Sequence, residues 1–161
     1  MISFEFKDHK FNYRAVAIIR SNDSVLLHKF KHDGVWSLPG GRVEFGESAN
    51  ESVERELFEE LGVKVKSIEP KWVVDNIYQY QGENFQELGI YFLVQLKLDS
   101  HIFREKEFRG IEPDVNIWFK WFHLDQLGSI GVYPEFLVDG LKNMPEGTEY
   151  IVNRAKAKGG T

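Results

Sequence analysis

Hydrophobic and polar residues alternate with two different periods along the chain, and each period predicts one kind of element. Short apolar runs bounded by turn residues are typical of strands, and the turn-rich stretch 21–24 joins the first two runs as a hairpin. Stretches rich in Val, Ile, Trp and Tyr indicate longer strands further on. The strands expected from this pattern lie at 14–20, 25–30, 63–80, 85–98, 117–123 and 149–152.

The clearest helix is expected at 48–61. Ser48, with Glu51 three residues later, has the form of a capping box, and Gly62 stands where a helix C-cap glycine belongs. Apolar residues four positions apart form one stripe along this helix, namely Ala49, Val53, Leu57 and Leu61.

The rest of the chain has weaker patterns. One helical turn is expected at 124–127 and a helix at 134–144, with Pro134 in its first turn. The polar stretch 101–116 is interpreted as a loop, and the basic, glycine-ended stretch 154–161 as a frayed tail. Because strands and helices mix without strict βαβ alternation, we expect an α+β fold, with helices flanking a mixed sheet in a single domain at 1–153.

Composition narrows the function. The 161 residues are 42% hydrophobic and carry a net charge of −5, so there is material for a core but no overall basic surface for a nucleic-acid polymer. The absence of cysteine excludes disulfides, thiolate metal sites and a cysteine nucleophile. No apolar run approaches the roughly 18 residues of a membrane span, and the first ten residues lack the apolar core of a signal peptide. We therefore expect a cytoplasmic enzyme with no membrane partner.

The strongest chemical signal is acidic. Glu56 and Glu60 lie four apart, so they share a helix face that borders the apolar stripe, and Glu59 lies close enough to join them. Such clustered carboxylates repel one another and suit Mg²⁺ or Mn²⁺, although a solvated acidic face is the plainer alternative. Seven glutamates fall between positions 40 and 63, namely Glu44, Glu47, Glu51, Glu54, Glu56, Glu59 and Glu60.

Two neighbouring features support this cluster. Arg55 is four residues from both Glu51 and Glu59, so we expect it to hold Glu59 by a charge-assisted bond. Gly40 and Gly41 follow Pro39, so the chain can turn sharply there and bring a backbone carbonyl towards the helix start as a further metal ligand. An ordinary Pro-Gly turn is the alternative.

These residues resemble the Nudix hydrolase family, whose box reads G-x5-E-x7-R-E-U-x-E-E-x-G-U, with U a bulky aliphatic residue. Every fixed position of the box is filled, and the looser resemblance outside it includes the lead-in 38–41 and the aromatic stretch 121–125. The matching residues are Gly41, Glu47, Arg55, Glu56, Leu57, Glu59, Glu60, Gly62 and Val63.

The resemblance implies an α/β/α sandwich, Mg²⁺ with Mn²⁺ as a substitute, and a small nucleotide substrate with a diphosphate linkage. It implies that Glu56, Glu59 and Glu60 face the metal and that Arg55 orients them. Glu47 would support the loop and reach a metal through water, and the carbonyl of Gly40 or Gly41 would complete the ligand set. Homodimers are common in the family, but the sequence identifies no interface.

The general base and the substrate contacts are less defined. The base is either a box glutamate, Glu56 or Glu59, or an acidic residue of 101–116, among which Glu112 is favoured because it lies shortly before the strand at 117–123. Glu87 interrupts an apolar strand, where it either faces a cleft or lies at a surface edge. Arg14 or Arg20 either pairs with a phosphate or is a surface charge at a strand end, and no aromatic residue is assigned to the substrate.

Two functions remain. The favoured one is metal-dependent hydrolysis of a nucleoside diphosphate derivative, such as a nucleoside triphosphate or a nucleotide sugar. The alternative is a catalytically silent module of the same fold that binds or senses a nucleotide. The complete set of box glutamates favours the enzyme, because a module that only binds has no need of them.

Overall fold

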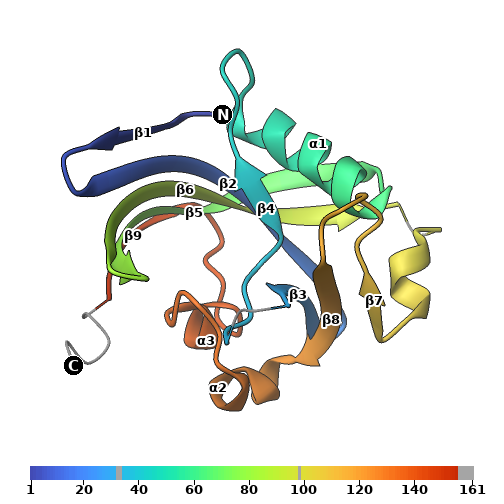
Figure 1. The fold of residues 1–161 in the computed structure, drawn as a ribbon. Helices are drawn as coiled ribbons and strands as arrows, with labels where there is room; N and C mark the ends of the chain where they lie inside the picture. Colours follow the sequence, from blue (N-terminus) through green and yellow to red (C-terminus); the bar gives the residue numbers. More distant parts are fainter. Residues whose placement is uncertain (32–33, 98, 156–161) are drawn as a thin grey trace.

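A mixed sheet with one long helix forms the frame of the computed structural model, which describes residues 1–31, 34–97 and 99–155 (Figure 1). The strands pair in the order β7-β8-β3-β2-β6-β5-β9, and β1 and β4 also pair with β2. The strands of the described ranges are β1 (Ser3–Phe6), β2 (His9–Ser21), β3 (Ser24–Phe30), β4 (Gly40–Arg42), β5 (Val65–Tyr80), β6 (Glu83–Leu96), β7 (Glu107–Arg109), β8 (Ile117–His123) and β9 (Glu149–Arg154). The helices there are α1 (Ala49–Leu61), α2 (Leu127–Ile130) and α3 (Leu137–Gly140), with 3₁₀ turns η1 (His101–Arg104) and η2 (Leu124–Gln126).

Strand β2 is the centre of the sheet. It runs parallel to β6 and antiparallel to β1, β3 and β4, so both kinds of pairing occur, as expected of a mixed sheet. Strand β4 pairs with residues 14–16 of β2, whereas β3 pairs only with residues 20 and 21. Because β3 and β4 pair with successive parts of one strand, the sheet divides beyond that point, and the two branches diverge (Figure 1).

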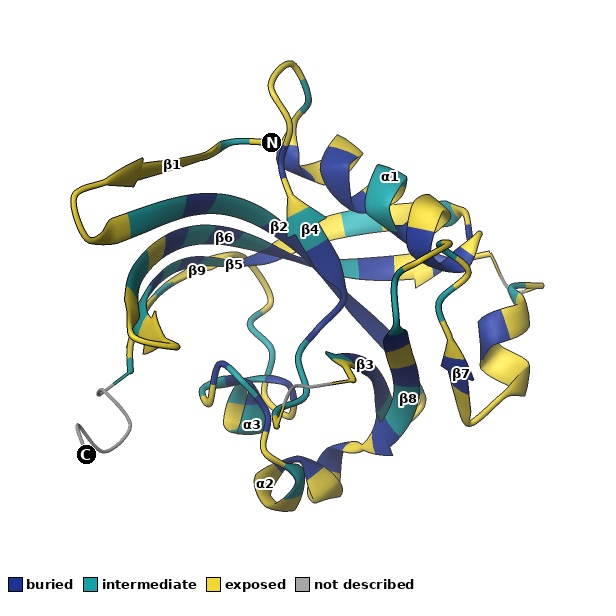
Figure 2. Cartoon of the chain, viewed as in Figure 1, coloured by how far each residue is buried: buried dark blue, intermediate teal, exposed yellow. Residues whose placement is uncertain are grey.

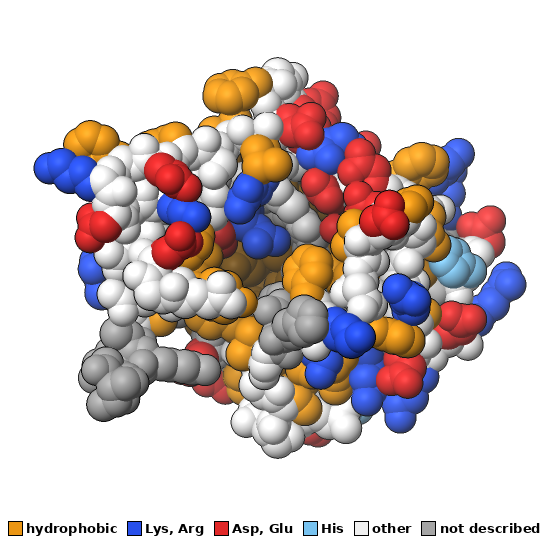
Figure 3. All heavy atoms as spheres, viewed as in Figure 1, with side chains coloured by type: hydrophobic (Ala, Val, Ile, Leu, Met, Phe, Trp, Pro, Cys, Tyr) orange, Lys and Arg blue, Asp and Glu red, His pale blue; other side chains and the backbone are white. Residues whose placement is uncertain are grey.

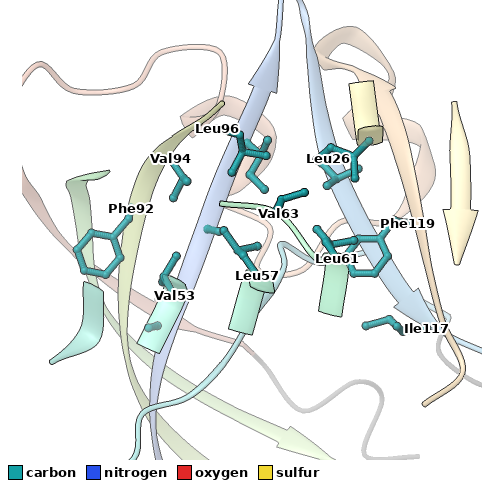
Figure 4. Packing of buried hydrophobic residues seen from close by; sticks show 14 of the residues in the cluster. Leu26, Val53, Leu57, Leu61, Val63, Phe92, Val94, Leu96, Ile117 and Phe119 are labelled. Carbon is teal, nitrogen blue, oxygen red and sulfur yellow. The ribbon is translucent and has the colours of Figure 1, made fainter. Parts of the chain in front are cut away.

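Helix α1 covers one face of the sheet. Its capping box is present, since the Ser48 side chain accepts from the Glu51 backbone N–H and the Glu51 side chain accepts from Ser48 N, and Gly62 ends it in the left-handed conformation. The residues of the apolar stripe are buried against the sheet, whereas Glu51, Glu54 and Glu59 are exposed, and the ribbon of α1 accordingly alternates between buried and exposed colours (Figure 2). Leu57 and Leu61 pack among side chains of both branches, with Leu26 and Phe119 from the branch of β3 and β8 and Val94 from β6 (Figure 4). Complete burial of one such leucine contributes about 1.5–3 kcal/mol.

The opposite face is covered by the segment after β8. Trp72 of β5 is at the centre of this second core and packs edge-on against Phe136. Leu127, Leu137 and Leu141 are fully buried against the same face. The fold is therefore α+β, with α1 on one side of the sheet and short helical segments on the other.

The expected helix at 134–144 is wrong in extent. Only Leu137–Gly140 is α-helical; the hydrogen bonds of Leu137 N and Val138 N before it span three residues rather than four, and the α-helix ends at Gly140. Leu137 and Leu141 are four residues apart, which suggested a longer helix, and both are buried in the core. The helical turn expected at 124–127 is present as η2, which leads into α2.

Other boundaries also differ from expectation. The stretch 101–116 is not a plain loop, because it contains η1 and the short strand β7. Strand β1 was not expected, and Arg154, assigned to the tail, closes β9. Residues 156–161 of the expected tail, and Leu98 of the expected strand 85–98, lie outside the described residues. None of the helices in the described ranges has the length and apolarity that crossing a membrane would require.

Candidate functional site

The contact between β4 and α1 brings the two ends of the acidic segment together. An ideal Cβ built on Gly41 would lie 2.3 Å from the Glu56 carboxyl carbon, so only glycine leaves room for this carboxylate. The neighbouring Gly40 lies against the backbone of β2, where a Cβ would be 2.3 Å from the Ala15 carbonyl oxygen. The two glycines are thus part of strand β4 rather than of the sharp turn expected after Pro39.

Glu60 is the most unusual acid of the helix. It is 7% exposed, and its Oε2 atom is buried without a hydrogen-bond partner. Burial, together with the nearby charges of Glu56 and Glu112, raises the pKa of Glu60 to about 8. A carboxylate that is buried, unpartnered and beside other acids is destabilised until a cation or proton neutralises it.

Glu56 belongs to the same cluster. Its pKa is raised chiefly by burial, and this effect is opposed by its ion pair with Arg55 and strengthened by Glu59 and Glu112. Glu112 comes from the segment between β7 and β8, which is fastened to the end of α1 by the hydrogen bond from Ile111 N to the Glu60 carbonyl, 2.8 Å. The structure therefore brings Glu112 to the box glutamates, as favoured from its position in the sequence.

Arg55 connects the remaining acids. Its Nη1 donates to Glu56 Oε1 at 3.0 Å and to Glu59 Oε2 at 3.2 Å, so the expected contact with Glu59 is present. Its closest partner is Glu47, which accepts from Nη2 at 2.8 Å and from Nε at 3.1 Å. The hydrogen bonds from Arg55 hold the pKa of Glu47 at about 2. Glu51, the other expected neighbour, instead accepts from Ser48 N in the capping box.

Glu47 also fixes the loop before the helix, since it accepts a hydrogen bond from Glu44 N at 2.9 Å. Its support of the loop thus agrees with the expectation for this residue. The partnership between Glu47 and Arg55 was missed, because the residues are eight apart and the intervening loop, not helix geometry, brings them together.

The donor set fits a hard divalent cation. Carboxylate and carbonyl oxygens are the ligands of Mg²⁺ and Mn²⁺, and the unpartnered Oε2 of Glu60 needs a positive neighbour. No group of three or more acidic, His or Cys side chains within the described ranges already has metal-holding geometry. Two of the relevant carboxylates, those of Glu56 and Glu59, are instead hydrogen-bonded to Arg55.

A second polar region lies on the face of the sheet away from α1. Arg14 of β2 is paired in register with Gly89 of β6, and its Nε is buried without a hydrogen-bond partner. Figure 3 shows the molecule hollowed between strands β2, β6 and β5 and the segment that follows β3, with hydrophobic side chains in the hollow and the acidic cluster over α1 beside it. Because Arg14 acts electrostatically on both Glu60 and Glu87, it links the two regions.

Arg20 and the aromatic residues near this region have structural contacts. Arg20 donates to the carbonyls of Leu141 and Asn22, so its contacts are structural. Trp72 and Tyr91 belong to the core at 2% and 4% exposure. His28 is buried near Arg14, and burial lowers its pKa to about 3.

Comparison with known proteins agrees with this geometry. A family model described as the NUDIX domain matches residues 11–140. The chain is 31% identical over 124 residues to the RNA pyrophosphohydrolase of Ruthia magnifica subsp. Calyptogena magnifica, which covers 68% of this chain and 69% of that protein. It is 47% identical over 47 residues to the putative 8-oxo-dGTP diphosphatase of Bacillus subtilis (strain 168), but that match spans only 29% of this chain and 32% of the relative.

Among solved structures, the crystal structure of the MutT NUDIX hydrolase from Burkholderia pseudomallei superposes with a TM-score of 0.62 at 28% sequence identity. The superposition covers 80% of this chain and 95% of that one. The likeness extends beyond the box and includes the mixed sheet and the helices that flank it.

Proposed function

This chain belongs to the NUDIX domain family and is a Nudix hydrolase, and from that premise we propose that it cleaves the diphosphate linkage of a nucleoside diphosphate derivative by attack of water on phosphorus. The substrate is a small nucleotide, such as a nucleoside triphosphate or a nucleotide sugar. The observation that carries the proposal is the buried Glu60 carboxylate, whose Oε2 has no hydrogen-bond partner within the described ranges and which is close enough to Glu56 and Glu112 to be influenced by their charges.

The acids have separate tasks in this mechanism. Glu56, Glu59 and Glu60 would hold a divalent cation, Mg²⁺ or in its place Mn²⁺, and the Gly40 carbonyl and Glu47 would be the further residues of this site. When bound, such a cation offsets the charge of the phosphates and makes water more acidic. Gly41 leaves the space that Glu56 occupies, and Arg55 fixes the directions of Glu56 and Glu59.

Glu112 is the favoured general base. It lies near enough to Glu56 and Glu60 to influence their protonation, and its segment is fastened to α1 by the Ile111 hydrogen bond. A carboxylate on a segment separate from α1 can accept the proton of the attacking water while the helix carboxylates keep their own contacts. The rival assignment gives this role to Glu56 or Glu59.

Arg14 binds a phosphate of the substrate. Its guanidinium has neither a hydrogen bond nor an ion pair to any residue of the described ranges, and its charge interacts with both Glu87 and Glu60. Arginine recognises phosphate oxygens through paired N–H donors. A diphosphate that reaches from the hollow to α1 would therefore pass it.

The alternative is a silent module that binds nucleotides without cleaving them. It leaves unexplained why the box retains every carboxylate, together with the glycine that makes room for Glu56.

A substrate screen decides between the two. It compares nucleoside triphosphates, dinucleoside polyphosphates, nucleotide sugars, ADP-ribose and a 5′-triphosphorylated RNA oligonucleotide, each with Mg²⁺, Mn²⁺ or EDTA. Turnover of a small nucleotide that EDTA abolishes supports the proposal. Thermal stabilisation by nucleotides without turnover of any compound would favour the silent module, and turnover of the RNA alone would refute the small-nucleotide substrate.

A further inference from the structure

Glu87 occupies the middle of the face that is turned away from α1. It is 8% exposed, although it is an acid on a central strand. Its register partners are Asn12 on β2 and Asn76 on β5, and Asn76 is in turn paired with Asn153 on β9. A row of polar residues thus crosses four strands of a face that otherwise carries core residues such as Val74 and Tyr91.

The amides of this row are engaged within the protein. Asn76 Oδ1 accepts hydrogen bonds from the Tyr133 hydroxyl at 3.0 Å and from Asn153 Nδ2 at 2.8 Å. Asn12 Oδ1 accepts from the Ser3 hydroxyl at 2.8 Å. Because the amides already hold one another and their neighbours, Glu87 is the member of the row whose negative charge needs a further partner.

No ion pair neutralises Glu87 among the described residues. Arg14 lies two positions along β2 from Asn12, the register partner of Glu87, but the two charged side chains form no ion pair within the described ranges. Two tyrosines approach from the other side, since Tyr78 is two residues from Asn76 on β5 and the Tyr133 hydroxyl donates to Asn76. Glu87 therefore offers two acceptor oxygens on a face that carries tyrosines on one side and the cationic Arg14 on the other.

The partner of Glu87 is not a metal ion. The charged group that faces it is Arg14, whose positive charge would repel a second cation. The chemistry instead calls for a ligand with neutral N–H or O–H donors at one end and negative charge at the other. A nucleotide has this character, because its base and sugar carry donors and its phosphates carry charge.

We propose that Glu87 selects the base of the nucleotide by accepting two neighbouring N–H groups, so that the preferred substrate is a guanine nucleotide. This inference rests on the proposed function, because it places the phosphates of the same ligand past Arg14 and towards Glu60. A carboxylate offers two acceptors and no donor. Guanine presents N1–H and its 2-amino group side by side, and therefore matches both oxygens.

The other bases match poorly. Adenine and cytosine place a ring nitrogen acceptor beside their amino group, and uracil flanks its N–H with two carbonyls, so each would turn a lone pair towards the carboxylate. Hypoxanthine keeps N1–H and lacks only the 2-amino group. A site built around a polar contact discriminates strongly against the analogue that lacks it, because a buried group is left unpaired.

The test is equilibrium binding of GDP, IDP and ADP to the intact protein, measured by calorimetry for wild type, Glu87→Gln and Glu83→Gln. Glu83 is an exposed acid on the same strand and serves as the matched control. We expect wild type to bind GDP roughly 10- to 100-fold more tightly than IDP. Glu87→Gln should bring the ratio close to one, and Glu83→Gln should leave it unchanged.

Three results would overturn the inference: equal affinity of wild type for GDP and IDP, tighter binding of ADP, or a GDP preference that survives in Glu87→Gln. A preference for GDP over 2′-deoxy-GDP in place of the preference over IDP would assign Glu87 to the ribose instead. The wild-type ratios decide the matter even if the variant does not fold. Guanine selectivity without hydrolysis would refute only the proposed function, and hydrolysis without selectivity would refute only this inference.

Discussion

Replacement of Glu60 by glutamine should stabilise the metal-free protein, although it should abolish activity. The folded protein keeps Glu60 buried beside two acids, and its pKa is about 8, against an ordinary value of 4.5. Folding therefore opposes the ionisation of this group. Glutamine has nearly the same shape and no charge, so the variant avoids this penalty.

The magnitude follows from linkage. One pKa unit corresponds to about 1.4 kcal/mol. The unfolded chain ionises Glu60 above pH 4.5, whereas the folded protein does so only above about pH 8, so at pH 7 the loss of folding free energy has accumulated from pH 4.5 to pH 7 and is about 3 kcal/mol. After allowance for burying an amide, we expect Glu60→Gln to raise the free energy of unfolding by about 2–3 kcal/mol in EDTA. Because the folded-state pKa is raised, the difference should be absent near pH 4, grow as the pH rises, and level off above about pH 8.

Urea denaturation followed by tryptophan fluorescence measures this difference directly. Glu54→Gln is the control, since Glu54 is an exposed acid of the same helix, and it should change stability by less than about 0.5 kcal/mol. Added Mg²⁺ should stabilise wild type by mass action and leave Glu60→Gln unaffected. Equal or lower stability of Glu60→Gln in EDTA at pH 7 would refute the argument that Glu60 is held in a cation-requiring site.

Three further predictions concern single residues. Gly41→Ala should fold normally but lower kcat by roughly 100-fold, because its Cβ displaces the Glu56 carboxylate, the end of a side chain that can rotate away. Gly40→Ala should instead lower the free energy of unfolding by about 1–3 kcal/mol, because its Cβ meets the backbone carbonyl of Ala15, which cannot move aside in this way. Similar behaviour of the two variants in urea and activity assays would contradict this reasoning. Glu112→Gln should lower kcat and leave the Mg²⁺ concentration for half-maximal rate unchanged, with Glu105→Gln as control; an unaltered kcat would return the role of base to the box. The pKa of His28 is about 3 in the folded protein, against an ordinary value of 6.5. The unfolded chain therefore takes up the proton first, and the free energy of unfolding should fall by about 2 kcal/mol between pH 7 and pH 5. Denaturation at both pH values should show a smaller loss for His28→Gln, and an identical loss would exclude this histidine as the cause.

Local features of the site were predictable from the sequence. The bounds of α1 follow from Ser48, Glu51 and Gly62, whose interactions reach no further than one helical turn. The shared face of Glu56 and Glu60 follows from helix geometry, and their partial burial from the neighbouring apolar stripe. The family resemblance assigned roles to these residues but could not supply their contacts.

Features that depend on distant pairing were not predictable. Asn12 and Glu87 lie side by side only because β2 runs parallel to β6 in one particular register, and the sequence does not state that register. Alternation along β6 did contain a usable signal, since Glu87, Gly89 and Tyr91 must share a face. The extent of the helix in 134–144 was misjudged because the leucines of this segment are spaced for a helix, whereas their packing against the core around Trp72 depends on residues far away in the sequence.

The most direct test of the central claim is hydrolysis in ¹⁸O-labelled water, with mass spectrometry of both phosphate products for wild type and Glu60→Gln. The account predicts that wild type with Mg²⁺ places one labelled oxygen on a phosphate of one product, and that EDTA or Glu60→Gln abolishes the reaction. Turnover that persists in EDTA or in Glu60→Gln, or products without label on phosphorus, would contradict it.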